Sequence, residues 1–303
     1  MIQMHKPIRI GTRDSALALW QARHVQNLLR NIDLESVLVP IKSSGDLNLS
    51  QPLYAMGITG VFTKELDIAL LNNQIDLAVH SMKDVPTQLP VGLSKAFVPE
   101  RGTATDVIVM KSDKLKNDKH IIATSSLRRQ AQWLNRYPND TVVPLRGNVQ
   151  TRLNKLNNHE WDAAIFARAG LERLKINPKN TVDLDWMIPA PAQGAVMVVA
   201  RSHDAQMTDG LRKLNHTPTT ICVEAERDFL KTLQGGCSAP IGAWAQIVND
   251  KIHFKGSLTG LDGKNHFIID EFYEKDTENV GVKAAESLLE TDEVTALLNK
   301  IKE

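Results

Sequence analysis

The strongest constraint on the fold is a regular alternation of short apolar runs with segments of helical periodicity along the first two thirds of the chain. Strand-like runs occur first at residues 8–10, 36–41 and 75–79. The helix after the first run is predicted from apolar residues that recur near the helical period, namely Leu17, Trp20, Val25, Leu28 and Leu29. Asp14 or Ser15 can cap it. A helix over residues 62–71 then precedes the run at 75–79, whose continuity is typical of a strand buried on both faces. This order indicates an α/β protein.

A second set of alternations follows, and then the pattern changes. Strands are predicted at residues 107–110, 121–123, 142–143 and 163–166, and helices at 127–136 and 149–156. The Pro-rich turn at 189–191 precedes a strand at 195–200, which we expect to return to the first domain. From residue 217 a helix is followed by runs at 243–248, 252–258 and 267–273 and by a final helix, which predicts a small α+β domain.

Composition excludes several classes of function. The 303 residues contain 36 Lys and Arg against 35 Asp and Glu, and this balance gives no global field that would attract nucleic acid or a membrane. The two cysteines, Cys222 and Cys237, are too sparse for a disulfide framework, and without a Cys-x-x-Cys pair no metal site is expected. The chain enters a strand at residue 8 and has no apolar run of about 20 residues, so we expect a cytoplasmic protein.

Basic side chains gather where two predicted strands pass into helices. Arg128 and Arg129 follow the hydroxyl-rich stretch 124–126, and Arg146 precedes Arg152 in the next turn. Helix starts bind anions, and guanidinium groups grip carboxylates with two bonds. Any one of these arginines is more simply a solvated residue paired with a local acid. However, residues 124–136 and 142–156 contain no acid, so unpaired positive charge and a polyanionic ligand are predicted.

The stretch His80-Ser81-Met82-Lys83-Asp84-Val85-Pro86 follows the predicted buried strand. Open α/β sheets bind ligands at the carboxyl ends of their strands. An ionised Asp84 there can accept hydrogen bonds from N–H groups, stabilise a cationic intermediate and transfer a proton. The alternative is a turn carboxylate that bonds its own backbone.

Cys237 lies in the loop Gly235-Gly236-Cys237-Ser238, between a predicted helix and a strand. The two glycines allow the backbone to bring the thiol close to a bulky group. An inert core cysteine is the usual alternative for a lone thiol, and Cys222, inside the preceding helix, fits that alternative well.

Taken together these stretches resemble the porphobilinogen deaminase family over nearly the whole chain. The matching stretches are ordered and dense, and such a set is far more specific than a single glycine motif. They are residues 11–18, 21–22, 64–66, 76–86, 124–129, 145–149, 167–174, 189–195 and 235–237.

The resemblance implies a fold of two doubly wound α/β domains like those of periplasmic binding proteins, plus a small C-terminal α+β domain. Domain 1 would comprise residues 1–99 and 197–216, domain 2 residues 100–196 and domain 3 residues 217–303. It also implies a transferase, hydroxymethylbilane synthase, of tetrapyrrole (haem) biosynthesis. This enzyme condenses four porphobilinogen molecules head to tail into hydroxymethylbilane with loss of ammonia. A monomer is expected.

The resemblance further implies a covalent dipyrromethane cofactor on Cys237 and a catalytic aspartate, Asp84. Residues matching the family's cofactor contacts are Ser81, Lys83, Asp84, Thr124, Ser126, Arg128, Arg129 and Arg146. Those expected to bind substrate are Arg13, Ser15, Arg146, Arg152, Arg173 and Gln193. The arginines suit this ligand because each pyrrole carries an acetate and a propionate, and crowding these charges is costly without paired cations.

The sequence departs from the family pattern at three places. Thr59, in Gly57-Ile58-Thr59-Gly60-Val61-Phe62, replaces the lysine of a common Gly-Gly-Lys-Gly-Leu-Phe, so a basic side chain is missing from a predicted active-site loop. The stretch 100–106 lacks the proline and second arginine of the expected hinge between domains 1 and 2. Arg168 adds a charge where the family is often uncharged.

Two rival functions are consistent with parts of this pattern. A non-catalytic two-lobed protein that binds an anionic solute would need the arginine turns but would have no use for Asp84 or the thiol loop. A cysteine hydrolase would need a histidine that activates Cys237, and the loop itself contains none.

Overall fold

The computed structural model describes residues 6–42, 63–113, 115, 119–234 and 239–302, with backbone only at Gln206 and Lys302. Contacts divide the chain into two compact units. Unit 1 contains residues 1–50, 57–102 and 194–220, and unit 2 contains residues 51–56, 103–193 and 221–303. Each unit is described by itself.

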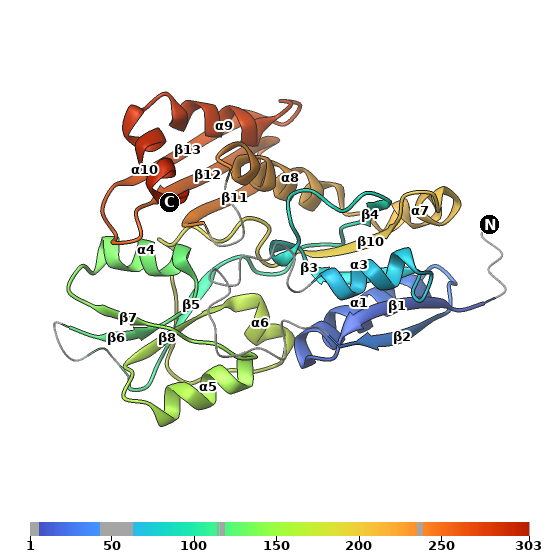
Figure 1. Ribbon diagram of the computed structural model, residues 1–303, viewed down its shortest axis with the longest axis horizontal. Coiled ribbons are helices and arrows are strands. Elements are labelled where there is room, and N and C mark those ends of the chain that lie inside the picture. Colours follow the sequence, from blue (N-terminus) through green and yellow to red (C-terminus); the bar gives the residue numbers. More distant parts are fainter. Residues whose placement is uncertain (1–5, 43–62, 114, 116–118, 235–238, 303) are drawn as a thin grey trace. The chain divides into compact units, whose positions relative to one another are not determined.

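Unit 1 is built on a five-stranded sheet of order β2-β1-β3-β10-β4 (Figure 1). Its strands are β1 (Ile8–Arg13), β2 (Ser36–Ile41), β3 (Leu77–Ser81), β4 (Leu93–Phe97) and β10 (Val196–Arg201). β1 pairs in parallel with β2 and β3, whereas β10 runs antiparallel to β3 and β4. The strand predicted at 195–200 therefore does return to the first sheet, between two strands formed much earlier in the chain.

Helices cover both faces of this sheet. Ile8 and Ile10 of β1 pack in one core with α1 (Ala16–Arg30) and α7 (Ala205–Leu211). Gly11, the residue after Ile10 in the alternation, faces the other side of the sheet, where a β-carbon would lie 2.2 Å from Ile75 Cδ1 and 3.0 Å from Leu66 of α3 (Lys64–Leu71). A larger side chain at position 11 would force the Ile75 side chain to move, so the glycine lets this side chain pack closely on the sheet.

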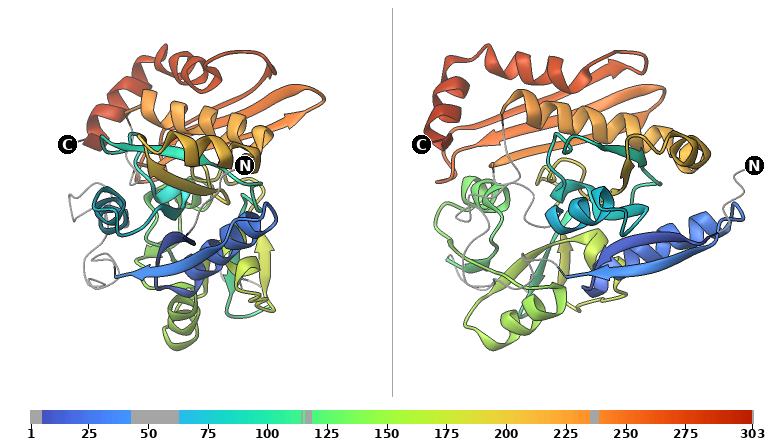
Figure 2. Two further views of the ribbon diagram at one scale, coloured as in Figure 1. Left: turned by 90° about the vertical axis from the view of Figure 1, so that its right-hand side faces the viewer. Right: turned by 45° about the vertical axis from the view of Figure 1, so that its right-hand side comes forward.

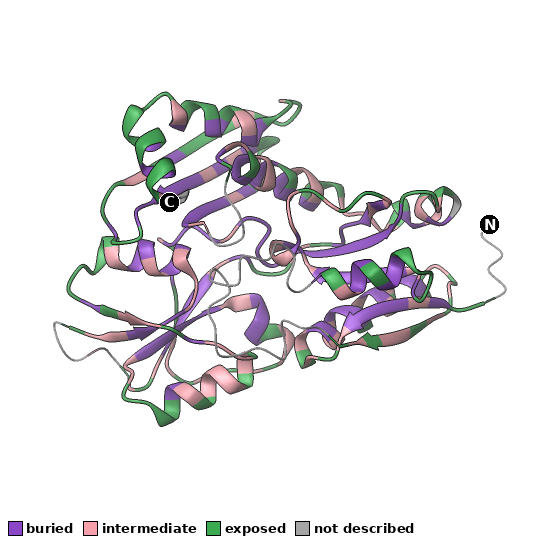
Figure 3. Ribbon diagram, viewed as in Figure 1, coloured by how far each residue is buried: buried purple, intermediate pink, exposed green. Residues whose placement is uncertain are grey.

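Unit 2 contains a second five-stranded sheet of order β7-β6-β8-β5-β9. The strands are β5 (Asp106–Met110), β6 (Ile121–Ala123), β7 (Thr141–Val143), β8 (Ala163–Ala167) and β9 (Thr181–Asp183). Trp133 of α4 (Leu127–Arg136) packs on one face, and α5 (Val149–Asn158) and α6 (Arg168–Arg173) contribute to the core on the other. Inner strands of both sheets are buried, β3 and β10 in the first and β5 and β8 in the second (Figure 3). Two doubly wound α/β sheets were predicted and are confirmed.

The C-terminal part of unit 2 is an antiparallel sheet, β11 (Ile241–Val248), β12 (Lys251–Thr259) and β13 (His266–Glu274). Its apolar face shares one core with α8 (Thr217–Thr232), α9 (Val280–Leu289) and α10 (Asp292–Lys302) (Figure 2). The predicted α+β architecture is confirmed, although the single final helix is two helices, because Thr291 interrupts them. The described strands form three separate sheets, one in each predicted domain, but the three-domain division itself stays a prediction.

Among the described elements, β4, β9, α6, α7 and two 3₁₀ turns at Met82–Asp84 and Arg212–Leu214 were not predicted. β9 has three residues and α6 six, and neither is long enough to show a period. No helix within the described ranges is long and apolar enough to cross a membrane.

Candidate functional site

In unit 1 the predicted residues follow two neighbouring parallel strands. Arg13 ends β1 and Ser81 ends β3, and these strands pair through Ile10 with Leu77 and Gly11 with Ala78. Because parallel strands end at the same edge of a sheet, Arg13, Ser15 and the stretch 81–84 lie at one edge. Ser15 caps α1 by accepting a bond from the Ala18 N–H at 3.3 Å, which decides between the two predicted caps.

Asp84 lies in a short 3₁₀ turn, Met82–Asp84, that directly follows β3. Met82 is buried and anchors the turn, and its carbonyl accepts a bond from the Val85 N–H at 3.2 Å. The Asp84 carboxylate is half-buried, and no hydrogen bond or ion pair joins it to another of the described side chains. The carboxylate is therefore positioned by the backbone and is available to a ligand.

Ser81 and His80 lie at the end of β3 and differ in their surroundings. Gln21 of α1 donates from Nε2 to Ser81 Oγ at 2.8 Å, so the amide fixes the serine side chain. His80 is buried, and its Nε2 has no hydrogen-bond partner among the described residues. Burial, together with the nearby positive charge of Arg13, lowers the pKa of His80 to about 4. His80 is therefore neutral at pH 7. Neither Gln21 nor His80 was given a role from sequence.

In unit 2 the carboxyl ends of β7, β6 and β8 also meet at one edge, because these strands are parallel neighbours. Ser125 Oγ accepts a bond from the Leu145 N–H at 2.8 Å and so joins the turns after β6 and β7. Thr124 Oγ1 accepts from the Ser126 N–H at 3.2 Å, and Ser126 caps α4. Each of these hydroxyls accepts a bond and keeps its own hydrogen for donation.

Arg128 and Arg129 are buried and share one carboxylate. Asp106, at the start of β5, is 2.7 Å from each guanidinium: Oδ2 faces Arg128 Nη2 and Oδ1 faces Arg129 Nη2. Arg129 also donates from Nε to Asp106 Oδ1 at 3.0 Å and from Nη1 to the Ile165 carbonyl at 3.0 Å. The prediction that these two arginines are unpaired is wrong, because the fold brings an acid from a distant strand.

The cluster nevertheless keeps excess positive charge, with two guanidinium groups around a single carboxylate. Arg128 donates from Nη1 to the Ile188 carbonyl at 2.8 Å, while its buried Nε has no hydrogen-bond partner within the described chain. Burial lowers the pKa of Arg128, and this is opposed by the charge of Asp106. An anion that bonded the Nε would satisfy this donor and balance the second charge.

Arg146 offers a second buried donor. It follows β7 and precedes Gly147, whose φ of +116° lets the chain turn into α5. Arg146 Nη1 is buried without a hydrogen-bond partner in the described residues. Arg152, one turn into α5, donates from Nε to the Gly147 carbonyl at 2.7 Å and steadies this turn. Thus the Arg146 turn carries an unsatisfied cationic donor.

The remaining predicted residues of unit 2 lie in different surroundings. Arg173 ends α6, and burial lowers its pKa. Gln193 is fully buried and donates from Nε2 to the Ala104 carbonyl at 2.7 Å and to Asp106 Oδ1 at 2.9 Å. Arg168 forms an ion pair with Asp183 of β9 at 2.5 Å, which accounts for its charge as a clamp on the edge strand.

Cys237, Thr59 and the rest of the 57–62 loop lie outside the described residues. Cys222 is buried in the core of the C-terminal sheet, as expected for a structural thiol.

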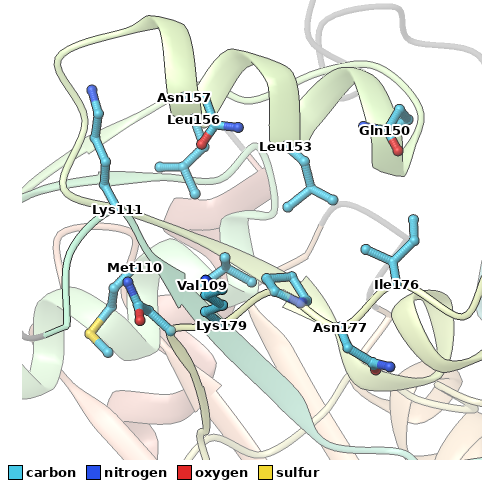
Figure 4. A pocket seen from close by; sticks show the side chains of 12 residues that line it. Val109, Met110, Lys111, Gln150, Leu153, Leu156, Asn157, Ile176, Asn177 and Lys179 are labelled. Carbon is cyan, nitrogen blue, oxygen red and sulfur yellow. The ribbon is translucent and has the colours of Figure 1, made fainter.

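A cavity of about 360 Å³ lies between α5 and residues 176–180 (Figure 4). Apolar side chains line it, among them Leu153, Leu156 and Ile176, and Lys111 and Lys179 also belong to the lining. None of the predicted site residues lines it, so we assign it no part in the reaction.

Comparison with protein families decides between an enzyme and a solute-binding protein. Residues 8–209 match the model of the porphobilinogen deaminase dipyrromethane cofactor binding domain, and residues 220–290 match that of the porphobilinogen deaminase C-terminal domain. The chain belongs to the porphobilinogen deaminase family. Relatives named porphobilinogen deaminase include one from Maridesulfovibrio salexigens, 42% identical over 94% of this chain and 95% of the relative. Another, from Carboxydothermus hydrogenoformans, is 41% identical over 94% of each.

The chain is thus a transferase, a hydroxymethylbilane synthase that condenses porphobilinogen on a dipyrromethane cofactor. Among solved structures, the periplasmic VFT2 domain of Bordetella pertussis BvgS is similar with a TM-score of 0.41 and 11% identity, covering 68% of this chain and 86% of that one. A probable amino-acid ABC transporter extracellular-binding protein of Bacillus subtilis has a TM-score of 0.42 and 10% identity, covering 69% and 90%. These two likenesses are too distant to bear on function.

Proposed function

We propose that the strand-end residues of the two units divide the work of porphobilinogen condensation. In this proposal Asp84 carries the chemistry, and the arginine turns of unit 2 bind the carboxylates of cofactor and growing chain. The observation that carries the proposal is the pair of buried guanidinium donors without a partner in the described chain, Arg128 Nε and Arg146 Nη1. A folded protein rarely leaves such buried donors without a partner, and a carboxylate ligand would supply one.

The donor set fits the dipyrromethane cofactor, whose acetate and propionate groups are anionic. Arg128, Arg129 and Arg146 supply guanidinium groups, Thr124 and Ser126 supply hydroxyls, and in unit 1 Ser81 and Lys83 supply further donors. When bound, the cofactor supplies the pyrrole to which the first substrate unit is joined. We propose Cys237 as its point of attachment, supported by the family match and by the two glycines before this thiol.

For Asp84 we propose two tasks. The carboxylate accepts hydrogen bonds from pyrrole N–H groups, and it stabilises the positive charge that develops as ammonia leaves the substrate. Its position at the end of a buried strand, without a partner among the described side chains, supports this role. Arg13, Ser15, Arg152, Arg173 and Gln193 are proposed to bind substrate or product carboxylates.

The test begins with the intact mass of the purified protein. The wild type should carry the mass of two pyrroles, and Cys237→Ser should lose both this mass and porphobilinogen consumption. Cys222→Ser is the matched control, because that thiol lies in the C-terminal core, and it should keep the adduct. An unmodified wild-type mass together with full activity would rule out attachment at Cys237.

We further propose that the enzyme is a cytoplasmic monomer that needs no metal. Only two cysteines occur in the 303 residues, and such sparse cysteine usage suits a reducing compartment. The large exposed apolar side chains among the described residues are spread over several elements, such as Val37, Ile68 and Phe272. Light scattering at micromolar concentration should give one chain's mass, 33.7 kDa.

A further inference from the structure

The segment of residues 188–193 in unit 2 is held by hydrogen bonds on two sides. From α4, Gln132 bonds both backbone groups of Ile188, accepting from its N–H at 2.8 Å and donating to its carbonyl at 3.0 Å. From the C-terminal sheet, the Ala243 N–H donates to the Pro189 carbonyl at 2.9 Å. A β-carbon on Gly242 would lie only 2.8 Å from the Ile188 carbonyl oxygen, so β11 and this segment are in close contact.

Glu226 of α8 adds the strongest of these attachments. It is fully buried, and each carboxylate oxygen accepts one backbone N–H: Oε2 from Ala192 at 2.6 Å and Oε1 from Ala245 of β11 at 2.7 Å. Ala192 has a φ of +60°, a left-handed conformation that costs an alanine about 1 kcal/mol or more. The hydrogen bond that Glu226 accepts thus comes from a residue whose backbone conformation is intrinsically unfavourable.

Gln193, the residue after Ala192, connects the segment to the two arginines through Asp106. Gln193 bonds Asp106 Oδ1 at 2.9 Å, and Asp106 pairs with both Arg128 and Arg129. Arg128 also bonds the Ile188 carbonyl at the other end of the segment. Segment 188–193 therefore contacts both Asp106 and Arg128, and Glu226 holds this segment at Ala192.

We propose that Glu226 is a positioning residue for carboxylate binding. It imposes the left-handed turn at Ala192 and thereby fixes the Gln193–Asp106–arginine cluster in the geometry that receives the ligand. The C-terminal domain thus acts on binding through α8 as well as through the loop that carries Cys237. The inference rests on the proposed function, because it takes Arg128 and Arg129 to bind carboxylates.

The test is Glu226→Gln in the holoenzyme. The amide is isosteric but presents an N–H donor to one of the two backbone N–H groups, so one bond is lost. We expect the KM for porphobilinogen to rise about tenfold with kcat changed by less than about twofold, because Gln193 of this cluster is proposed to bind substrate and its ground-state and transition-state binding weaken alike. Hydrogen exchange at the Ala192 and Gln193 amides should quicken about tenfold or more.

Phe229→Leu is the matched control. Phe229 lies one turn further along α8, packs against Phe254 at 5.3 Å between ring centroids and does not belong to the cluster. This variant should lower the Tm without raising the KM. A KM for Glu226→Gln at least about fivefold above that of Phe229→Leu supports the proposal, and a smaller ratio overturns it.

If Glu226→Gln does not fold, a second variant can be measured in its place. Gln132→Met removes the two bonds to Ile188 from the opposite side, and the same fivefold criterion applies to it. Hydrogen exchange also distinguishes an effect of Glu226 on the turn from an effect on the arginines. Faster exchange at Ala192 with an unchanged KM would show that Glu226 holds the turn but does not position the arginines, and this overturns the proposal. A wild type that does not consume porphobilinogen would instead contradict the proposed function.

Discussion

The two strand-end clusters hold their charged groups in opposite ways. In unit 2, Arg128 and Arg129 are buried and bonded to one fully buried acid, Asp106. In unit 1, the Asp84 carboxylate is half-buried without a partner in the described chain, and the buried neighbour of the 81–84 stretch, His80, is neutral. Binding a polycarboxylate requires cations already in place, whereas a carboxylate that serves successive substrates must remain available. The buried arginines of unit 2 are therefore suited to hold a ligand in a fixed position, whereas Asp84 of unit 1 is suited to act on successive substrates.

Asp106→Asn should have the largest effect on folding. It leaves two buried guanidinium groups close together without their shared carboxylate, and breaking a buried ion pair costs about 3–5 kcal/mol. We expect the free energy of unfolding, measured in urea, to fall by that amount and cofactor loading to fail. A loss below about 1 kcal/mol would contradict the idea that unit 2 depends on a buried pair.

Asp84→Asn should separate chemistry from stability. The amide cannot stabilise a developing positive charge, so we expect kcat to fall by about 10²–10³-fold. Because Asp84 has no partner among the described side chains, the free energy of unfolding should change by less than about 0.5 kcal/mol. Single-turnover kinetics and urea unfolding of the same preparation provide the two measurements. Porphobilinogen consumption at the wild-type rate would exclude the role given to Asp84.

The pH dependence of stability should report His80. Its pKa in the folded protein is about 4, against an ordinary value of 6.5, so the unfolded chain binds more protons between these values. The stabilisation is therefore complete above about pH 6.5 and is lost as the pH falls towards 4, by about 3 kcal/mol at most. His80→Leu should flatten this part of the profile of unfolding free energy against pH.

Asp76 is the control for the pH range between 6.5 and 4. Asp76 loses stabilisation only at lower pH, because its bonds to Arg9 outweigh burial and lower its pKa below the usual 3.8. Asp76→Asn should therefore leave the slope between pH 6.5 and 4 intact. An unchanged slope in His80→Leu would show that His80 does not titrate there.

Asp183→Asn should have the smallest effect. The ion pair of Asp183 with Arg168 is partly exposed, with 44% and 25% of the two side chains accessible, so it should contribute about 0–1 kcal/mol. Comparison of the two variants, Asp183→Asn and Asp106→Asn, shows how far burial changes the contribution of an arginine–aspartate pair to the free energy of unfolding. A loss comparable to that of Asp106→Asn would show that β9 depends on this clamp.

Much of the fold follows from local pattern. The helix predicted at 127–136 is present as α4 over Leu127–Arg136, because its period and its Ser126 cap are both encoded within a few residues. The strand at 36–41 is equally local. β9, in contrast, exists because its three residues pair with β5, and this partner is distant in the sequence.

The partners of the proposed site residues could not be predicted from the sequence. The acid-free stretch 124–136 indicates an anion site, yet the acid that pairs with Arg128 and Arg129 comes from β5. The roles of Gln21 and Glu226 were missed for the same reason, since each acts on a residue remote in sequence. Gln193 was predicted to bind substrate, and its amide nitrogen is already bonded within the protein.

The place of β10 in the first sheet has a consequence for biosynthesis. All strands of the second sheet have been made once the ribosome has passed Asp183, whereas the first sheet still waits for Val196–Arg201 to enter between β3 and β4. Until then β3 and β4 emerge with unpaired edges, which are open to wrong pairing. The chain should therefore complete its second sheet before its first, and nascent chains that stop before residue 196 should be the species most in need of chaperones.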